Sequence, residues 1–168
     1  MCFSFEVSLG TFIISWAISI YLLTKKLTVA QRHNVIALMC FSSIQALDAI
    51  LWYNKMKKNT INYVVTSFLI PFVLSAQMFY NILIINKIKN PLTIIGLIIV
   101  TIYIFIKFNG YSLPLCNNKL ASPVWGNSEI KLWEFILFSV IIFYPNFKHI
   151  YVLNLLLLFL THVFVGGA

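Results

Sequence analysis

Asp48 is the residue of this 168-residue chain whose type and position point most directly to chemistry. It interrupts an apolar segment that runs from about Asn34 to Tyr53. A charged carboxylate in such a helix costs on the order of 2.5–3.5 kcal/mol at the middle of a bilayer. The carboxyl group must therefore meet a partner or a water-filled cavity, or be protonated. We expect a ligand, proton-relay or catalytic position here, and the alternative is a hydrogen bond between helices.

Two neighbours share the helical stripe of this acid. The pattern Gln45-x-x-Asp48-x-x-x-Trp52 places an amide, a carboxyl group and an indole at i, i+3 and i+7, which is one face of a helix. We interpret the three residues as the centre of a small-ligand, ion or proton site.

Glu6, Glu134 and His162 are further candidates for that site. Both glutamates fall in the first turn of a predicted helix, where a carboxylate is stabilised by the helix dipole and can stay hydrated. His162 lies in a leucine-rich segment. It could be a ligand, a proton carrier or a neutral imidazole bonded to a neighbouring helix. The helix-capping and helix-bonding interpretations are the simpler ones for these three side chains.

A metal-dependent intramembrane hydrolase is the alternative function. Asp48, Glu134 and His162 could hold a divalent cation whose bound water supports hydrolysis. Their spacing is not diagnostic, because the chain contains no His-Glu-x-x-His, Cys-x-x-Cys, phosphate loop or Gly-x-Ser-x-Gly. A retinal cofactor is not expected, since the sixth predicted span lacks the lysine that a Schiff base needs and no other span is expected to bury one. A purely structural or assembly role is the third hypothesis.

The composition of the chain indicates that membrane-spanning helices carry these candidate side chains. Hydrophobic residues make up 61% of the chain and charged residues only 10%, against about 25% charged residues in soluble domains. This excludes an ordinary soluble enzyme and a disordered chain. We therefore expect an all-α, polytopic membrane bundle of about six transmembrane helices.

The predicted spans form a single transmembrane domain over residues 1–168. Thr28-x-x-Gln31 fits a capping box before the second span, and Asn90-Pro91 fits a cap followed by proline at the first helical position. Pro71 should kink the third span rather than end it. The spans cover about 6–24, 33–53, 60–86, 91–107, 129–144 and 150–166, and 108–128 forms a loop.

An even number of spans brings the candidate residues to one membrane face. Glu6, Asp48, Glu134 and His162 all fall toward this face, with the loop that carries Trp125. We interpret Trp125 as an aromatic anchor in the membrane interface. Cys2 and Cys116 fall on the same face and could form a disulfide there if the compartment is oxidising.

The net charge of +8 does not orient the chain. Its twelve basic residues, eleven lysines and one arginine, divide equally between the two faces of a six-span bundle. Only the first span favours one orientation, because bases follow it and none precedes it, which would place both termini on the non-cytoplasmic side. We expect a bilayer with anionic headgroups as the partner rather than nucleic acid, and a homo-oligomer remains an open alternative.

The start of the chain also carries a family likeness. Met1-Cys2-Phe3-Ser4-Phe5-Glu6-Val7-Ser8, together with Gln45-x-x-Asp48 and Trp52 on the second span, resembles small multi-pass membrane proteins of unknown function in large DNA viruses and algae. The likeness covers about the first third of the chain, and the loop cysteine and tryptophan of that family would correspond to Cys116 and Trp125. It implies a multi-pass membrane protein and supplies no activity.

Overall fold

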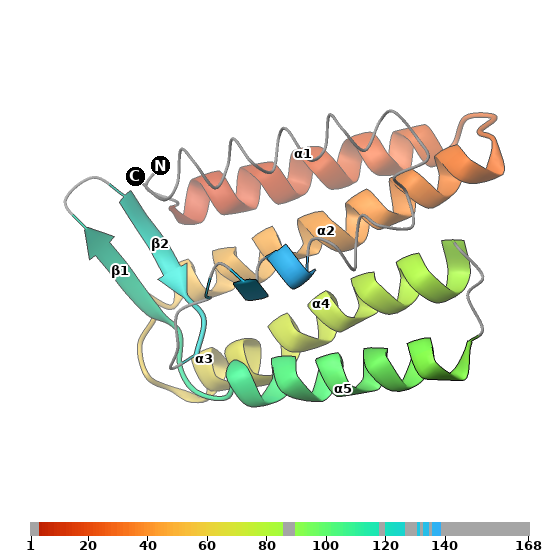
Figure 1. Ribbon diagram of the computed structural model, residues 1–168. Coiled ribbons are helices and arrows are strands. Elements are labelled where there is room, and N and C mark those ends of the chain that lie inside the picture. The colour runs from red at the N-terminus through yellow and green to blue at the C-terminus, as the bar shows by residue number, and fades with distance from the viewer. Residues whose placement is uncertain are drawn as a thin grey trace.

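The described part of the chain is built mainly from long helices. The computed structural model describes residues 4–85, 90–117, 120–126, 131, 133, 134 and 136–138. Within these residues, three helices are long and apolar enough to cross a membrane, and a shorter apolar helix follows them. They are α1 (Phe5–Leu23), α2 (Val29–Tyr53), a helix that runs from Thr60 to Ile85, and α5 (Pro91–Lys107) (Figure 1).

Local side-chain caps set where two of these helices begin. The hydroxyl of Thr28 accepts from the backbone N–H of Gln31, and the Gln31 side chain accepts from the backbone N–H of Thr28. This confirms the predicted capping box, and α2 accordingly begins earlier than the span expected from hydropathy. Asn90 caps α5 through the N–H of Leu92, with Pro91 in the first turn, as the sequence predicts.

The third long helix continues through Pro71 but is not regular. It consists of α3 (Thr60–Val64), the π-helical segment η1 (Val65–Leu69), α4 (Ile70–Phe79) and the π-helical segment η2 (Tyr80–Ile85). A proline lacks an N–H and crowds the carbonyl of the preceding turn. The wider π turn directly before Pro71 accommodates this, so the helix is neither broken nor ended there.

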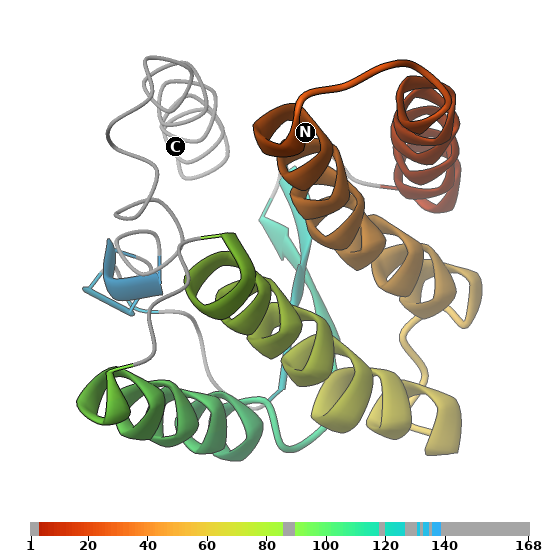
Figure 2. The ribbon, with the colours of Figure 1, turned by 90° about the vertical axis from the view of Figure 1, so that its right-hand side faces the viewer.

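Each helix packs mainly against the next one in the chain. α1 lies on α2, α2 on α4, and α4 on α5 (Figure 2). Polar side chains join α2 to the third helix at two levels. The imidazole Nδ1 of His33 lies 2.9 Å from the hydroxyl of Tyr80, and the amide of Gln77 donates to the carbonyl of Cys40 over 3.0 Å.

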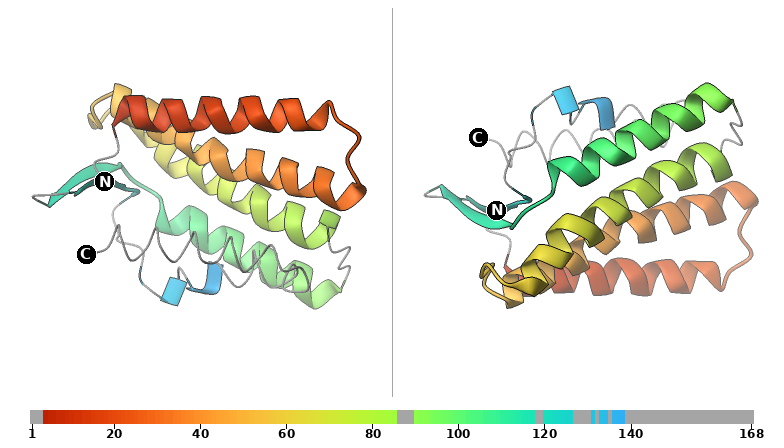
Figure 3. Two further views of the ribbon diagram at one scale, coloured as in Figure 1. Left: turned by 90° about the horizontal axis from the view of Figure 1, so that it is seen from above. Right: turned by 90° about the horizontal axis from the view of Figure 1, so that it is seen from below.

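A β hairpin follows α5, where the sequence predicts only a loop over 108–128. Strands β1 (Leu113–Asn117) and β2 (Leu120–Val124) pair antiparallel, with Leu113 opposite Val124. Pro114 and Pro123 face each other in this ladder, and prolines argue against a central strand but are tolerated in edge strands. The all-α expectation is therefore corrected at this connection. The hairpin extends beyond the helix ends (Figure 3).

One end of the bundle carries most of the candidate residues. The start of α1, the end of α2, the end of α5 and the hairpin all lie there (Figure 1). This is the arrangement that the parity of the spans predicts for Glu6, Asp48 and Trp125. The predicted span at 129–144 is described only in part, and the span at 150–166 lies outside the described residues.

Candidate functional site

Asp48 is buried near the end of α2 and bonded to the hairpin connection. Its side chain is 7% exposed, and its carboxylate Oδ1 accepts a hydrogen bond of 2.9 Å from the indole Nε1 of Trp125. These residues lie 77 positions apart in the chain. Among the described residues, the partner of the buried acid is therefore an indole after β2 rather than a polar side chain of a neighbouring helix.

Two residues close to Asp48 along α2 each carry a buried polar atom. The amide Oε1 of Gln45 and the indole Nε1 of Trp52 are buried, and neither makes a hydrogen bond to any residue that the structure describes. A buried unsatisfied polar group costs about 1–3 kcal/mol. Because positions three and four apart are neighbours on a helix surface, Gln45 and Trp52 share one face of α2 with Asp48. The predicted stripe of amide, acid and indole is thus one buried polar face.

Trp125 is held in place by apolar packing on both sides. Its ring meets Phe108 edge-on, at 5.9 Å between centroids and 78° between planes. It also contacts two clusters of buried side chains, one around Leu51 and Ile70 and the other around Met78. The interpretation of Trp125 as an interface anchor stays a prediction, and the fold gives this half-buried ring a further role, because it joins the two clusters and donates to Asp48.

Gly126 lets the chain approach α5 closely enough to place Trp125. It has a φ of +74°, and a methyl group added there would lie 2.9 Å from the Cα of Phe108. Only glycine adopts this conformation without steric cost and leaves room for the neighbouring backbone. The close contact between Gly126 and Phe108 fixes the position from which the indole reaches the carboxylate.

A buried hydrogen-bond network holds the segment between α5 and the hairpin. The amide of Asn62 donates to the carbonyl of Ser112 and accepts from its N–H, over 2.9 and 2.8 Å. Thr66 donates to the amide oxygen of Asn62 and lies 2.7 Å from the Ser112 hydroxyl. Ser67 bonds both the N–H and the carbonyl of Gly110. Most of these donors and acceptors come from the π-helical turn η1 and the turn before it, and π turns are frequent at functional sites.

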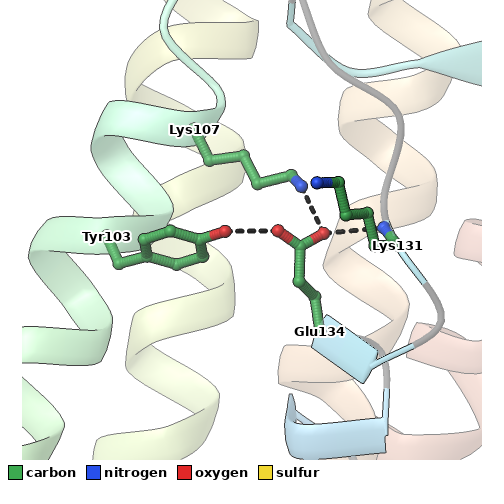
Figure 4. Close-up of polar contacts among 4 residues, drawn as sticks. All are labelled: Tyr103, Lys107, Lys131 and Glu134. Atoms are coloured by element: carbon green, nitrogen blue, oxygen red, sulfur yellow. Dashed lines mark hydrogen bonds and ion pairs between the residues drawn. The ribbon is translucent and has the colours of Figure 1, made fainter.

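Glu134 belongs to a second cluster, beside α5. Its carboxylate pairs with the ammonium group of Lys107, accepts from the hydroxyl of Tyr103, and accepts from the backbone N–H of Lys131 over 2.7 Å (Figure 4). The side chains of Glu134 and Lys107 are only 9% and 10% exposed. Glu134 stands at the start of a helical segment, as the sequence predicts, and accepts there from the N–H of Lys131. The expectation that its carboxylate stays hydrated is corrected, because these three donors surround it.

The remaining candidates lie elsewhere or are not described. Glu6 is exposed in the first turn of α1, where its carboxylate accepts from the hydroxyl of Ser4 over 2.6 Å. Cys2 and His162 lie outside the described residues, and the side chain of Cys116 is not described, so the disulfide stays a prediction. Glu6, Asp48 and Glu134 share no hydrogen-bond partner within the described part of the chain.

A metal site is not assembled from the side chains that can be placed. Among the described residues, no group of three or more His, Cys, Asp or Glu side chains could hold a metal ion. Zinc takes four ligands and usually three or four of them from protein. The predicted set of Asp48, Glu134 and His162 includes a residue outside this description and stays a prediction.

The sequence alone identifies Asp48 as a candidate, but it does not predict the long-range contacts in and around the site. Polar residues of the second span single out Asp48, yet no local pattern pairs it with Trp125. The network of Asn62 with Ser112 spans 50 positions, and the ion pair of Lys107 with Glu134 spans 27. Serine, threonine and asparagine before Pro71 were the available signal, since such residues join helices in membranes.

Comparison with known proteins gives no relative for this chain. No protein-family model matches it, and no curated protein or solved structure is significantly similar to it. The class of protein that the fold defines is a mostly helical one with apolar helices long enough to cross a bilayer. These helices fit an integral membrane protein.

Proposed function

We propose that this chain is a multi-pass membrane protein in which Asp48 takes up and releases a proton near one membrane face. Three apolar helices of spanning length support the membrane location. Asp48 lies near the end of α2, and its hydrogen-bond partner Trp125 directly follows β2. An ionisable side chain inside a membrane span is a functional candidate by default, and proton relays use such acids.

A single observation carries the proposal. Asp48 is buried and accepts from Trp125, while the buried Oε1 of Gln45 has no partner among the described residues. The charged carboxylate keeps the indole N–H as its donor. The neutral acid gains an O–H that needs an acceptor, and Gln45 stands three positions before Asp48 on the same face of α2. Each protonation state of Asp48 therefore has a partner suited to it.

A proton suits these groups better than a divalent cation does. Divalent cations require four or more ligands in a fixed geometry, whereas a proton requires one donor and one acceptor. The residues described here bring only one carboxylate to the stripe of Gln45 and Trp52. The hydrolase alternative predicts stoichiometric zinc in the purified protein that Asp48→Asn removes, and a metal assay of both proteins decides between the two functions.

Infrared difference spectroscopy across a pH titration tests the proposal. In wild-type protein in liposomes, we expect a protonated carboxyl band that disappears as the pH rises. The band should be absent in Asp48→Asn and unchanged in Glu134→Gln, which removes another buried acid at a separate cluster. A band that survives in Asp48→Asn would contradict the proposal.

A structural role is the second candidate function, and the bond from Trp125 favours it. Asp48 would then fix the hairpin on α2 without any change of protonation. In that case Asp48→Asn keeps the hydrogen bond, since an amide oxygen also accepts from an indole, and no titrating band is observed. Unchanged stability with no titration would support this second role.

The larger architecture is also part of the proposal. We propose about six spans with both termini on the non-cytoplasmic side, and a relationship to the small membrane proteins of large DNA viruses and algae. Single cysteines placed in the connections, labelled with a membrane-impermeant thiol reagent, test the number of spans. Equal labelling of the first and second connections from one side would overturn this topology.

A further inference from the structure

The turn between α2 and α3 has an unusual backbone. The N–H of Met56 bonds the carbonyl of Leu51, and the N–H of Lys55 bonds the carbonyl of Trp52. These two bonds form a Schellman motif at the end of α2. Lys55 and Met56 have φ values of 52° and 47°, so two successive residues with side chains are left-handed.

Lysine at the first of these positions is costly. The residue after the C-cap of a Schellman motif is usually glycine, because other L-residues pay roughly 1–2 kcal/mol in the left-handed region. Such strain is concentrated at functional positions, and it persists only where the surrounding structure holds it. The presence of Lys55 indicates that its side chain matters for something other than the turn.

The surrounding contacts make this turn rigid. The side-chain amides of Asn54 and Asn59 donate to each other, over 2.8 and 2.9 Å. Asn59 also caps the next helix by accepting from the N–H of Asn62 over 3.0 Å. Met56 is 3% exposed and packs into the apolar cluster around Leu51. The backbone of the turn is thus fixed from three directions.

Three ammonium groups project from this rigid backbone. Lys55, Lys57 and Lys58 are exposed, and the salt bridge found within the described residues is that of Lys107 with Glu134. The three lysines are therefore unpaired by any acid in that part of the chain. Because α2 ends at Tyr53 and the next apolar helix begins at Thr60, the turn lies at the membrane boundary.

We infer that this trilysine turn, residues 54–59, binds the phosphate group of an anionic lipid headgroup. A phosphate at this depth offers charged oxygen acceptors to the ammonium groups of Lys55, Lys57 and Lys58. Its source is a lipid, because the turn joins two helices of membrane-spanning length, which would bring its lysines to headgroup level in a bilayer. The site does not depend on the protonation of Asp48.

Native mass spectrometry of the full chain in mild detergent tests this site. The probes are phosphatidylglycerol, phosphatidylcholine and inorganic phosphate. We expect one molecule of phosphatidylglycerol to bind in preference to phosphatidylcholine. Replacing Lys55, Lys57 and Lys58 by glutamine should weaken its binding by roughly 100-fold, since each lysine near a membrane surface contributes about fivefold.

A matched variant separates a built site from general charge. Replacing Lys25, Lys26 and Arg32 by glutamine removes the same charge from the connection between α1 and α2, and binding should stay within about twofold. Equal losses in the two triple variants would overturn the site. Competition by inorganic phosphate at the concentration of the lipid would overturn the lipid assignment.

A glycine variant tests the role of the strained lysine. Lys55→Gly relieves the left-handed strain and removes one ammonium group, so the protein should unfold at a higher temperature while lipid binding falls about fivefold. Higher stability with unchanged binding would show that Lys55 is not part of the site.

Discussion

Replacing Trp125 by phenylalanine removes one hydrogen bond and keeps most of an aromatic ring. The lost bond is the 2.9 Å contact from the indole Nε1 to a carboxylate that is only 7% exposed. A hydrogen bond to a charged group contributes about 1.5–3 kcal/mol, and one between neutral groups about 0.5–1.5 kcal/mol. Phenylalanine can still pack on Phe108, so most of the destabilisation should come from the bond.

A double-mutant cycle with Asp48→Ala isolates that contribution. Trp125→Phe alone leaves the carboxylate buried without its donor, whereas Trp125→Phe in the Asp48→Ala background removes no bond. We expect a coupling free energy of about 1.5–3 kcal/mol where Asp48 is charged, falling to about 1 kcal/mol where it is neutral. The size of the coupling thus also reports the protonation state.

The assay is equilibrium unfolding in mixed micelles of mild detergent and sodium dodecyl sulfate, followed by circular dichroism. Trp133→Phe paired with Asp48→Ala is the control, because Trp133 is exposed and its ring contact is with Tyr103. That control pair should couple by less than about 0.5 kcal/mol. The same small value for Trp125 would refute the reasoning.

Two further predictions concern the packing that positions this site. Gly126→Ala should destabilise the protein by about 1–2 kcal/mol or more, because a left-handed φ and a clash with Phe108 combine. Gly96→Ala, in open space within α5, should instead stabilise it by about 0.5–1 kcal/mol. Asn62→Ala removes three buried hydrogen bonds and should cost about 3 kcal/mol. Its control, Asn34→Ala at an exposed position of α2, should change stability by less than about 0.5 kcal/mol. The same unfolding assay measures all four variants. Equal effects of the two glycine variants, or of the two asparagine variants, would contradict the packing described.

Features encoded by a few adjacent residues could be predicted from the sequence. The capping box of Thr28 with Gln31 and the cap at Asn90 are local signals, and both are confirmed. The persistence of the third helix through Pro71 is also predictable, because membrane helices tolerate proline. The position of Asp48 within an apolar run is equally local.

Contacts between distant segments could not be predicted in the same way. The sequence predicts an interface position for Trp125 because tryptophans are frequent at span ends. Only the fold brings this residue to Asp48. The hairpin is not predictable from local sequence, because Pro114 and Pro123 argue against strands. Glu134 was interpreted from its own helix, but its donors Lys107 and Tyr103 come from α5.

The proton site at Asp48 and the lipid site at the trilysine turn use different chemistry, but their side chains pack into a common apolar cluster. Met56 of the trilysine turn belongs to the same apolar cluster that contacts Trp52 and Trp125. A change in the position of the turn would therefore also shift the packing of Trp52 and Trp125. The lipid and proton experiments are separate, so failure of one leaves the other standing.

The pH dependence of the Trp125 indole signal tests the central claim most directly. Nuclear magnetic resonance of ¹⁵N-labelled protein in lipid nanodiscs resolves the indole N–H groups of its four tryptophans, and Trp125→Phe assigns the relevant one. We predict that the Trp125 signal shifts with pH, that this shift disappears in Asp48→Asn, and that Trp133 stays constant. A Trp125 signal that does not move with pH, or that moves equally in Asp48→Asn, would contradict a proton site at Asp48.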